Sequence, residues 1–250
     1  MKMRVFEIRE LIRESLAVPK GAVVSVFGDD NVHKIVLWSP TLMVSAMKAE
    51  GAVKGDPDSS FMALATIDHD EDDTYILGII GLDRLKKSAA WNDSGKGWEV
   101  VNVAAKKGYG PLMFNFAIGD LGAVIPDRNT MTDDSTRVWK KFDTGASPGV
   151  KLKPLDDEDN PKTKTKIDDA PTLKKKSKSD LYKKEDFPLA IRNTAAVGQG
   201  ISTKALQIKA DQQIKKICSI YALEPDVVLE EIEAASGEFF QTYFANAVMS

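Results

Sequence analysis

The stretch Trp98–Phe142, WEVVNVAAKKGYGPLMFNFAIGDLGAVIPDRNTMTDDSTRVWKKF, carries the pattern that decides the fold. Its apolar run Val100–Ala104 is typical of a buried β-strand. The glycine-containing segment Lys106–Pro111 comes next, and Leu112–Leu121 then has the apolar spacing of a helix. The stretch therefore predicts a strand, a tight turn and a helix in direct succession.

The turn has the composition of an anion-binding helix N-terminus. The first N–H groups of a helix have no intrahelical partner and lie at the positive end of its dipole. Gly108 and Gly110 let the backbone bend tightly and approach a ligand, Pro111 suits the first helical turn, and Lys106 and Lys107 add positive charge. These features favour a bound phosphate or pyrophosphate. An ordinary strand–turn–helix corner fits the same residues, so the turn alone leaves both interpretations open.

The sequence on both sides of this stretch predicts an α+β fold within the wider α/β class, with a mixed, mostly antiparallel sheet flanked by helices. A hairpin is expected where β-branched and aromatic runs flank the turn residues Gly28–Asn31. Further strands are expected at 61–67, 75–82, 98–104 and 123–126, of which the first three form an antiparallel meander. Helices are expected at 41–49 and 133–141, and a loop is expected at 51–60.

Changes in composition divide the chain into four parts. These are an amphipathic helix at 1–19, the sheet-containing domain at 20–145, a charged linker or extended arm at 146–200, and a helical region at 201–250. The amphipathic pattern of the first part favours a helix that packs on its own domain. In the last part, Pro225 is expected in the first turn of a helix and Gly237 at its C-cap.

Bulk composition argues against several classes of function. The chain has 250 residues, a net charge of −3 and one cysteine, so it has neither an internal disulfide nor a basic surplus for nucleic acid as its main partner. The apolar runs are too short to span a bilayer, which predicts a protein without a membrane segment. Cys218 is expected in the core, and His69, which lies among acidic residues, in a solvated turn rather than a metal site.

The succession of strand, x-x-x-Gly-x-Gly turn, helix, strand and helix resembles the GNAT superfamily of N-acetyltransferases over residues 20–145. The resemblance implies acetyl-CoA as the cofactor. The glycine turn would hold its pyrophosphate, and backbone groups at the strand end would hold its pantetheine arm. The binding residues implied are Val103, Lys106, Lys107, Gly108, Tyr109, Gly110 and Thr132, the last at the position of an Asn of the family.

A narrower resemblance links the chain to uncharacterised GNAT-like proteins of tailed bacteriophages. The segments that carry it are GYGPLMFNFA, PDRNTMTDDSTRVWKKF and LDDEDNPKTK. It implies a location in the virion or the host cytoplasm, and contacts with other phage structural proteins through the N-terminal helix, the 146–200 arm and the C-terminal helices. Ile8-Arg9-Glu10 and Ile12-Arg13-Glu14 also fit the loose cleavage pattern of phage capsid-targeting helices, as an alternative to packing on the same domain.

Besides Thr132, the chain departs from the GNAT pattern at three positions. Ala105 stands where Arg or Gln usually opens the phosphate loop, and Ser135 replaces an Ala. Trp139 stands at the position of the Tyr that often protonates the departing thiolate, and an indole cannot act as an acid at neutral pH. Glu99 or Asp83 is the candidate catalytic base, acting through water, although both also fit surface carboxylates. Two functions stay open: an acetyltransferase of unspecified acceptor, and a virion-associated interaction protein on a catalytically inactive scaffold.

Overall fold

The computed structural model describes residues 17–69, 74–84, 97–126, 133–145, 147, 149–154, 194–198 and 200–249. The predicted N-terminal helix, Thr132 and most of the charged arm lie outside the described residues. The elements in chain order are β1 (Val23–Gly28), β2 (Val32–Trp38), α2 (Pro40–Ala49), α3 (Pro57–Ala65), β3 (Ile76–Arg84), β4 (Trp98–Ala105), α4 (Gly110–Leu121), β5 (Ala123–Val124), α5 (Asp133–Asp143), β6 (Val150–Pro154), β7 (Thr194–Gly198), α7 (Lys204–Tyr221) and α8 (Pro225–Met249). The fold is thus a mixture of helices and mainly antiparallel strands.

The first sheet has the strand order β1-β2-β3-β4, and every neighbouring pair is antiparallel. The turn between β1 and β2 is held by Asp29, whose Oδ1 accepts the N–H groups of Asn31 at 2.6 Å and Val32 at 3.0 Å. These two bonds lower the pKa of the Asp29 carboxyl. The predicted hairpin is therefore confirmed, together with the strands expected at 75–82 and 98–104.

The strand expected at 61–67 is wrong, because these residues belong mainly to helix α3. Asp56 caps this helix by accepting the N–H groups of Asp58 and Ser59, and Pro57 occupies its first turn. The cap and the helix-forming Met, Ala and Leu residues outweigh the apolar run that suggested a strand. The loop expected at 51–60 consequently ends at Asp56, and the meander consists of β2, β3 and β4 instead.

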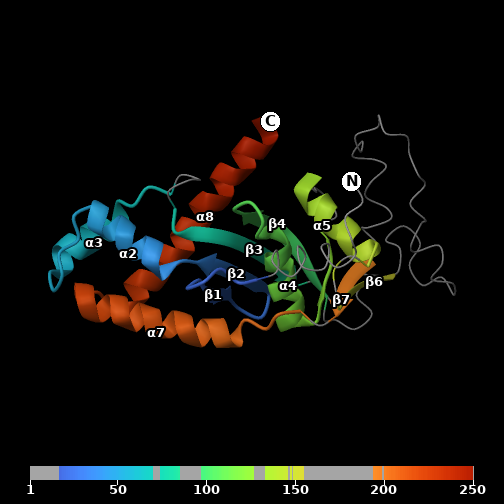
Figure 1. Cartoon of the computed structure of the whole chain (residues 1–250), viewed down its shortest axis with the longest axis horizontal. Helices are drawn as coiled ribbons and strands as arrows, with labels where there is room; N and C mark the ends of the chain where they lie inside the picture. The colour runs from blue at the N-terminus through green and yellow to red at the C-terminus, as the bar shows by residue number, and fades with distance from the viewer. Residues whose placement is uncertain are drawn as a thin grey trace.

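Helices cover both faces of the first sheet (Figure 1). Successive residues of a strand point to opposite faces, and Ile35 and Leu37 belong to one core cluster while Val36 and Trp38 belong to another. The first cluster joins the sheet to α4 and α5 and includes Phe114, Phe116, Trp139 and Phe142. The second joins it to α2, α3, α7 and α8 and includes Tyr75, Tyr221, Val228 and Phe239. The C-terminal helices thus share a core with the sheet.

A second sheet, of order β5-β7-β6, lies at the end of the molecule opposite α2 and α3 (Figure 1). Strands β6 and β7 both come from the region expected to be an extended arm. They pair antiparallel with Pro154 opposite Thr194, so the two ends of segment 155–193 lie side by side. The strand expected at 123–126 is present as the short β5 and an isolated bridge at Ile125.

The chain between β7 and α7 crosses directly over α4. The N–H of Ile201 donates to the carbonyl of Asn115 at 3.0 Å, and a Cβ added to Gly119 would lie 2.4 Å from the carbonyl carbon of Ile201. Helix α7 then begins where Asp120, on α4, accepts the N–H of Thr203 at 2.9 Å. A residue of one helix therefore supplies the N-terminal hydrogen bond of another.

Two of the three predictions on the C-terminal region are confirmed. Pro225 lies in the first turn of α8, and Cys218 is buried. The predicted C-cap at Gly237 is wrong, because α8 continues without interruption to Met249. Ser236 and Phe239 beside it are fully buried, and this packing outweighs the cost of about 1 kcal/mol for a glycine inside a helix. Among the described residues, every helix is too short or too polar to cross a bilayer.

Candidate functional site

Strand β4 contains a bulge at the centre of the candidate site. Leu82 lies opposite Val100 and Gly81 lies opposite Asn102, so Val101 is an extra residue without a partner in β3. The side chain of Val101 is 43% exposed. A bulge of this kind changes the direction in which the following backbone groups point, so it determines where the rest of β4 places its N–H groups.

The hydrogen bonds at the two ends of β4 define these directions. The N–H of Val100 donates to the carbonyl of Ile125 at 2.9 Å, on the side of β5, whereas the N–H of Lys106 donates to Leu77 at 2.9 Å, on the side of β3. Successive N–H groups of a strand point to opposite sides. Counting back from Lys106, the N–H groups of Val103 and Ala105 point away from β3.

Strands β4 and β5 are parallel and meet at one end only. The N–H of Ile125 donates to the carbonyl of Trp98 at 2.8 Å, and Glu99 and Ile125 form an isolated parallel bridge. Beyond Val100, the edge of β4 that faces away from β3 has no neighbouring strand among the described residues. This free edge carries the N–H groups of Val103 and Ala105 and leads directly into the glycine turn.

The glycine turn leaves the N-terminus of α4 open. Gly108 has a φ of +97°, which favours glycine, and Tyr109 precedes the helix without capping it through its side chain. Apart from the adjoining residues and the backbone of α4, every described atom lies more than 4 Å from a Cβ added at Gly108 or Gly110. The two glycines therefore leave room for a ligand group close to the backbone, whereas the N–H groups of Tyr109 and Leu112 already donate to the carbonyls of Lys106 and Tyr109 within the turn.

The two lysines of the turn have different environments. The Lys106 ammonium donates to the backbone carbonyl of Thr74 at 3.0 Å, which holds it against the segment before β3. Lys107 is exposed. Both add positive charge near the N-terminus of α4, but only Lys106 has its position set by a described hydrogen bond to this segment.

The two candidate bases lie together, at the other end of β4 from the turn. Asp83 and Glu99 are directly opposite each other in β3 and β4; Asp83 is exposed and Glu99 is partly buried. Seven residues of extended strand separate Glu99 from Lys106, a distance of roughly 23 Å. Only a long ligand lying along β4 would contact the turn and approach these carboxylates at the same time.

Trp139 is a core residue. Its side chain is fully buried and packs edge to face against Phe114, with ring centroids 5.9 Å apart, and against Phe142, at 5.6 Å. Its indole nitrogen is buried without a hydrogen-bond partner among the described residues. The side chain that replaces the expected acid thus contributes to packing between α4 and α5.

The prediction that His69 lies in a solvated turn is wrong, because only 7% of this residue is exposed. Its Nε2 lies 3.0 Å from Oε1 of Glu231 on α8, and the same oxygen accepts the hydroxyl of Tyr75 at 3.3 Å. Burial, followed by the negative charge of Glu231, raises the pKa of Tyr75 well above 10.0. No local pattern could have revealed this cluster, because Glu231 is 162 residues away from His69.

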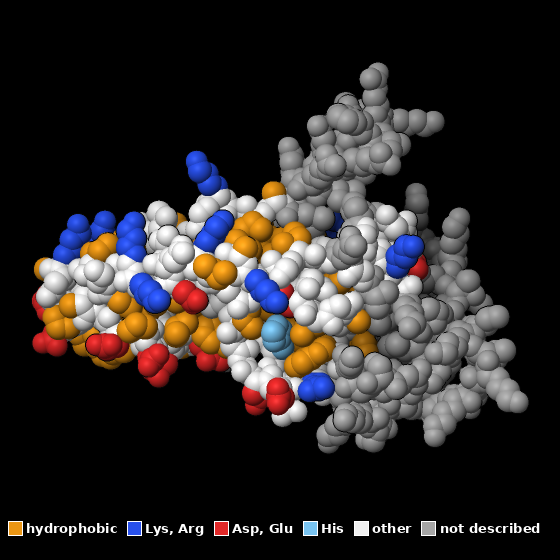
Figure 2. Space-filling view, turned by 90° about the horizontal axis from the view of Figure 1, so that it is seen from below, with side chains coloured by type: hydrophobic (Ala, Val, Ile, Leu, Met, Phe, Trp, Pro, Cys, Tyr) orange, Lys and Arg blue, Asp and Glu red, His pale blue; other side chains and the backbone are white. Residues whose placement is uncertain are grey.

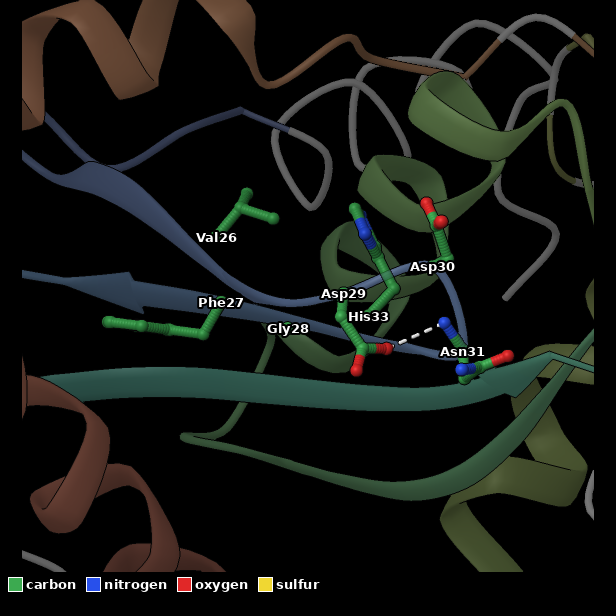
Figure 3. Close-up of a pocket in the computed structure, with 7 residues that line it drawn as sticks. All are labelled: Val26, Phe27, Gly28, Asp29, Asp30, Asn31 and His33. Atoms are coloured by element: carbon green, nitrogen blue, oxygen red, sulfur yellow. Dashed lines mark hydrogen bonds between the residues drawn. The ribbon is translucent and has the colours of Figure 1, made fainter.

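A cavity of about 530 Å³ lies at the β1–β2 hairpin (Figure 3). Its lining residues are Val26, Phe27, Gly28, Asp29, Asp30, Asn31 and His33. Burial lowers the pKa of His33, an effect that the charge of Asp120 opposes. Figure 3 shows the Asp29 carboxylate directed to the Asn31 N–H, so this side chain is already used by the turn. None of the binding or catalytic residues predicted from the sequence lines this cavity.

Comparisons of the chain with protein-family models, with curated proteins and with solved structures find no match. Among the described residues, no group of three or more His, Cys, Asp or Glu side chains is arranged to hold a metal ion.

Proposed function

We propose that the chain binds acetyl-CoA along the free edge of β4 and transfers the acetyl group to an amine. The observation that carries the proposal is the row of two outward-facing backbone donors on β4, which leads to the glycine turn. The N–H groups of Val103 and Ala105 point away from β3, and the strand leads directly to the open N-terminus of α4. Such a row fits a ligand that has an anionic group at one end and an amide-containing arm behind it.

Each part of the edge has a separate role in this proposal. The turn at Gly108–Gly110 binds the pyrophosphate, assisted by Lys106 and Lys107, and the backbone of β4 binds the arm. The N–H of Val103 polarises the thioester carbonyl, as preorganised backbone donors do at a developing oxyanion. Acetyl-CoA would supply a thioester: its C–S bond would break as the amine nitrogen forms a C–N bond to the acyl carbon, and coenzyme A would leave as a thiolate that takes a proton from water. Glu99 or Asp83 accepts the proton of the amine through water.

Trp139 favours a second candidate, a virion-associated interaction protein on an inactive scaffold. The buried indole cannot donate a proton to a departing thiolate at neutral pH. On the face seen in Figure 2, side chains of both charge signs are present, without a continuous basic field of the kind that binds nucleic acid. This face therefore suits a protein partner better than nucleic acid.

Calorimetry with acetyl-CoA tests the proposal, and Gly110→Glu is the informative variant. A carboxylate in the first turn of α4 stabilises the helix but repels a phosphate. Two charges about 5.5 Å apart repel by about 3 kcal/mol at an effective dielectric constant of about 20, so we expect a loss of affinity of more than tenfold. Ser202→Glu adds the same charge next to the N-terminus of α7 and should leave binding unchanged.

Three outcomes separate the candidate functions. Binding by the wild type, weakened by Gly110→Glu only, together with release of free thiol in the presence of an amine, supports acetyl transfer. Binding without turnover on a panel of amines favours the inactive scaffold. Failure of the wild type to bind millimolar acetyl-CoA removes the first proposal, and detection of the chain in purified virions by mass spectrometry then supports the second.

A further inference from the structure

One carboxylate oxygen of helix α8 holds residues on both sides of segment 70–73. Oε1 of Glu231 lies 3.0 Å from Nε2 of His69 and accepts the hydroxyl of Tyr75 at 3.3 Å. The rings of His69 and Tyr75 also pack edge to face, with centroids 5.3 Å apart. His69 is 7% exposed and Tyr75 is fully buried, so these contacts are shielded from solvent.

The residues that Glu231 holds are directly connected to the glycine turn. Tyr75 follows Thr74, which is fully buried, and the carbonyl of Thr74 accepts the Lys106 ammonium at 3.0 Å. The carbonyl of Tyr75 in turn accepts the N–H of Ser39, which fixes the backbone at this point. The path from α8 to Lys106 therefore consists of two side-chain hydrogen bonds joined by a single peptide unit.

The Tyr75 hydroxyl is the donor at the centre of this path. Burial and the charges of Glu231 and Glu238 raise the pKa of Tyr75, so its phenol stays protonated and remains a donor to Glu231. The Tyr75 hydroxyl lies 3.3 Å from Oε1 of Glu231, which is long for an O–H···O hydrogen bond, but removing Glu231 would leave this buried donor without its partner, and an unpaired buried donor is costly.

We infer that Glu231 is a positioning residue for the glycine turn, which it orders through Tyr75, Thr74 and Lys106. Helix α8 thereby controls the geometry of a turn that lies more than a hundred residues earlier in the chain. The consequence for acetyl-CoA affinity rests on the proposed function, but the ordering of the turn does not.

Hydrogen–deuterium exchange of the full-length protein tests the ordering without any ligand. In Glu231→Ala, we expect the amides of 104–112 to exchange about tenfold to a hundredfold faster, as loss of a buried hydrogen bond to a charged group implies. Glu231→Gln keeps an oxygen that accepts from His69 and Tyr75, and should restore most of the protection. Glu233→Ala, which removes only the exposed pair with Lys34, is the matched control on the same helix.

The backbone amides of residues 35–38 in β2 serve as the reference, because their exchange reports global unfolding. Comparing them with the amides of 104–112 separates a local effect from a general loss of stability. Faster exchange at 104–112 with unchanged exchange at 35–38 supports the inference. Equal acceleration in both places, or no difference between Glu231→Ala and Glu233→Ala, overturns it. Lys106→Met provides a second test, because the two substitutions should be strongly non-additive if they interrupt one path. Simple additivity would also overturn the inference.

Affinity for acetyl-CoA separates failure of the inference from failure of the proposed function. If the wild type binds, Glu231→Ala should weaken binding and Glu233→Ala should not. If Glu231→Ala exchanges faster but binds acetyl-CoA with unchanged affinity, the inference that α8 influences binding is overturned. If the wild type does not bind, the proposed function fails, while the exchange data still decide whether Glu231 orders the turn.

Discussion

Pro154 and Thr194 lie directly opposite each other in β6 and β7, so residues 155–193 form a long excursion between adjacent strand ends. We predict that Asn-Gly, the pair favoured in two-residue hairpins, can replace the whole excursion. The cost of closing a flexible loop grows as (3/2)RT ln n, so shortening it from about 39 residues to two should raise the free energy of unfolding by up to about 2.6 kcal/mol. For a chain of this size, the corresponding rise in Tm is about 5–10 °C.

Urea unfolding of the shortened and full-length proteins measures this change. A variant that carries a scrambled 155–193 segment of the same composition is the control, and its stability should equal that of the wild type. A stability loss of more than about 1 kcal/mol in the shortened protein, or loss of a single cooperative transition, would refute the reasoning. It would mean that loop-closure entropy does not determine the effect of this deletion.

Three further predictions concern single residues. Burial holds the pKa of His33 below its ordinary 6.5, so the free energy of unfolding should fall as the pH drops below 6.5. Urea titrations at several pH values should show that this free energy changes less with pH in His33→Asn than in the wild type. The pKa of Tyr75 is raised, so the contribution of this group to the free energy of unfolding is complete below pH 10.0 and is lost as the pH rises above it. Tyr75→Phe should weaken this alkaline loss of stability. At neutral pH the same substitution should cost about 1 kcal/mol, because Glu231 loses a hydrogen-bond donor. Gly119→Ala would place a Cβ 2.4 Å from the carbonyl carbon of Ile201. A thermal-unfolding scan should therefore show a loss of about 1–3 kcal/mol in the free energy of unfolding. A smaller loss would mean that the segment between β7 and α7 moves aside at low cost.

The strand, turn and helix around Gly108 were predictable because each is specified by neighbouring residues. The apolar run of β4, the Gly-x-Gly-Pro sequence and the helical spacing of α4 all lie within 24 consecutive residues. Helix α3 was missed although its signal is local: Asp56 and Pro57 form a helix start, but the apolar residues after them suggested a strand. In this case a cap and helix-forming residues outweighed hydrophobicity.

Features that depend on distant partners were not predictable from local patterns. The bulge at Val101 is defined by how β4 pairs with β3, and no residue type in β4 indicates its position. His69 is buried because of Glu231, which lies on a helix at the other end of the chain. Strands β6 and β7 are five residues each and are separated by a long charged segment, so neither has a recognisable hairpin signal.

The shared core between the sheet and α8 has a consequence for synthesis on the ribosome. Trp38, Ile79 and Ala104 form one face of the sheet and are covered by residues as late as Phe239. At about 5–20 residues per second, roughly 7–27 s pass between the synthesis of Ala104 and that of Phe239. During that interval only α2 and α3 are available to cover this sheet face, and the apolar surface left for α7 and α8 is of the kind that chaperones bind. Folding of this protein in the cell should therefore depend on chaperone supply more than its modest size suggests.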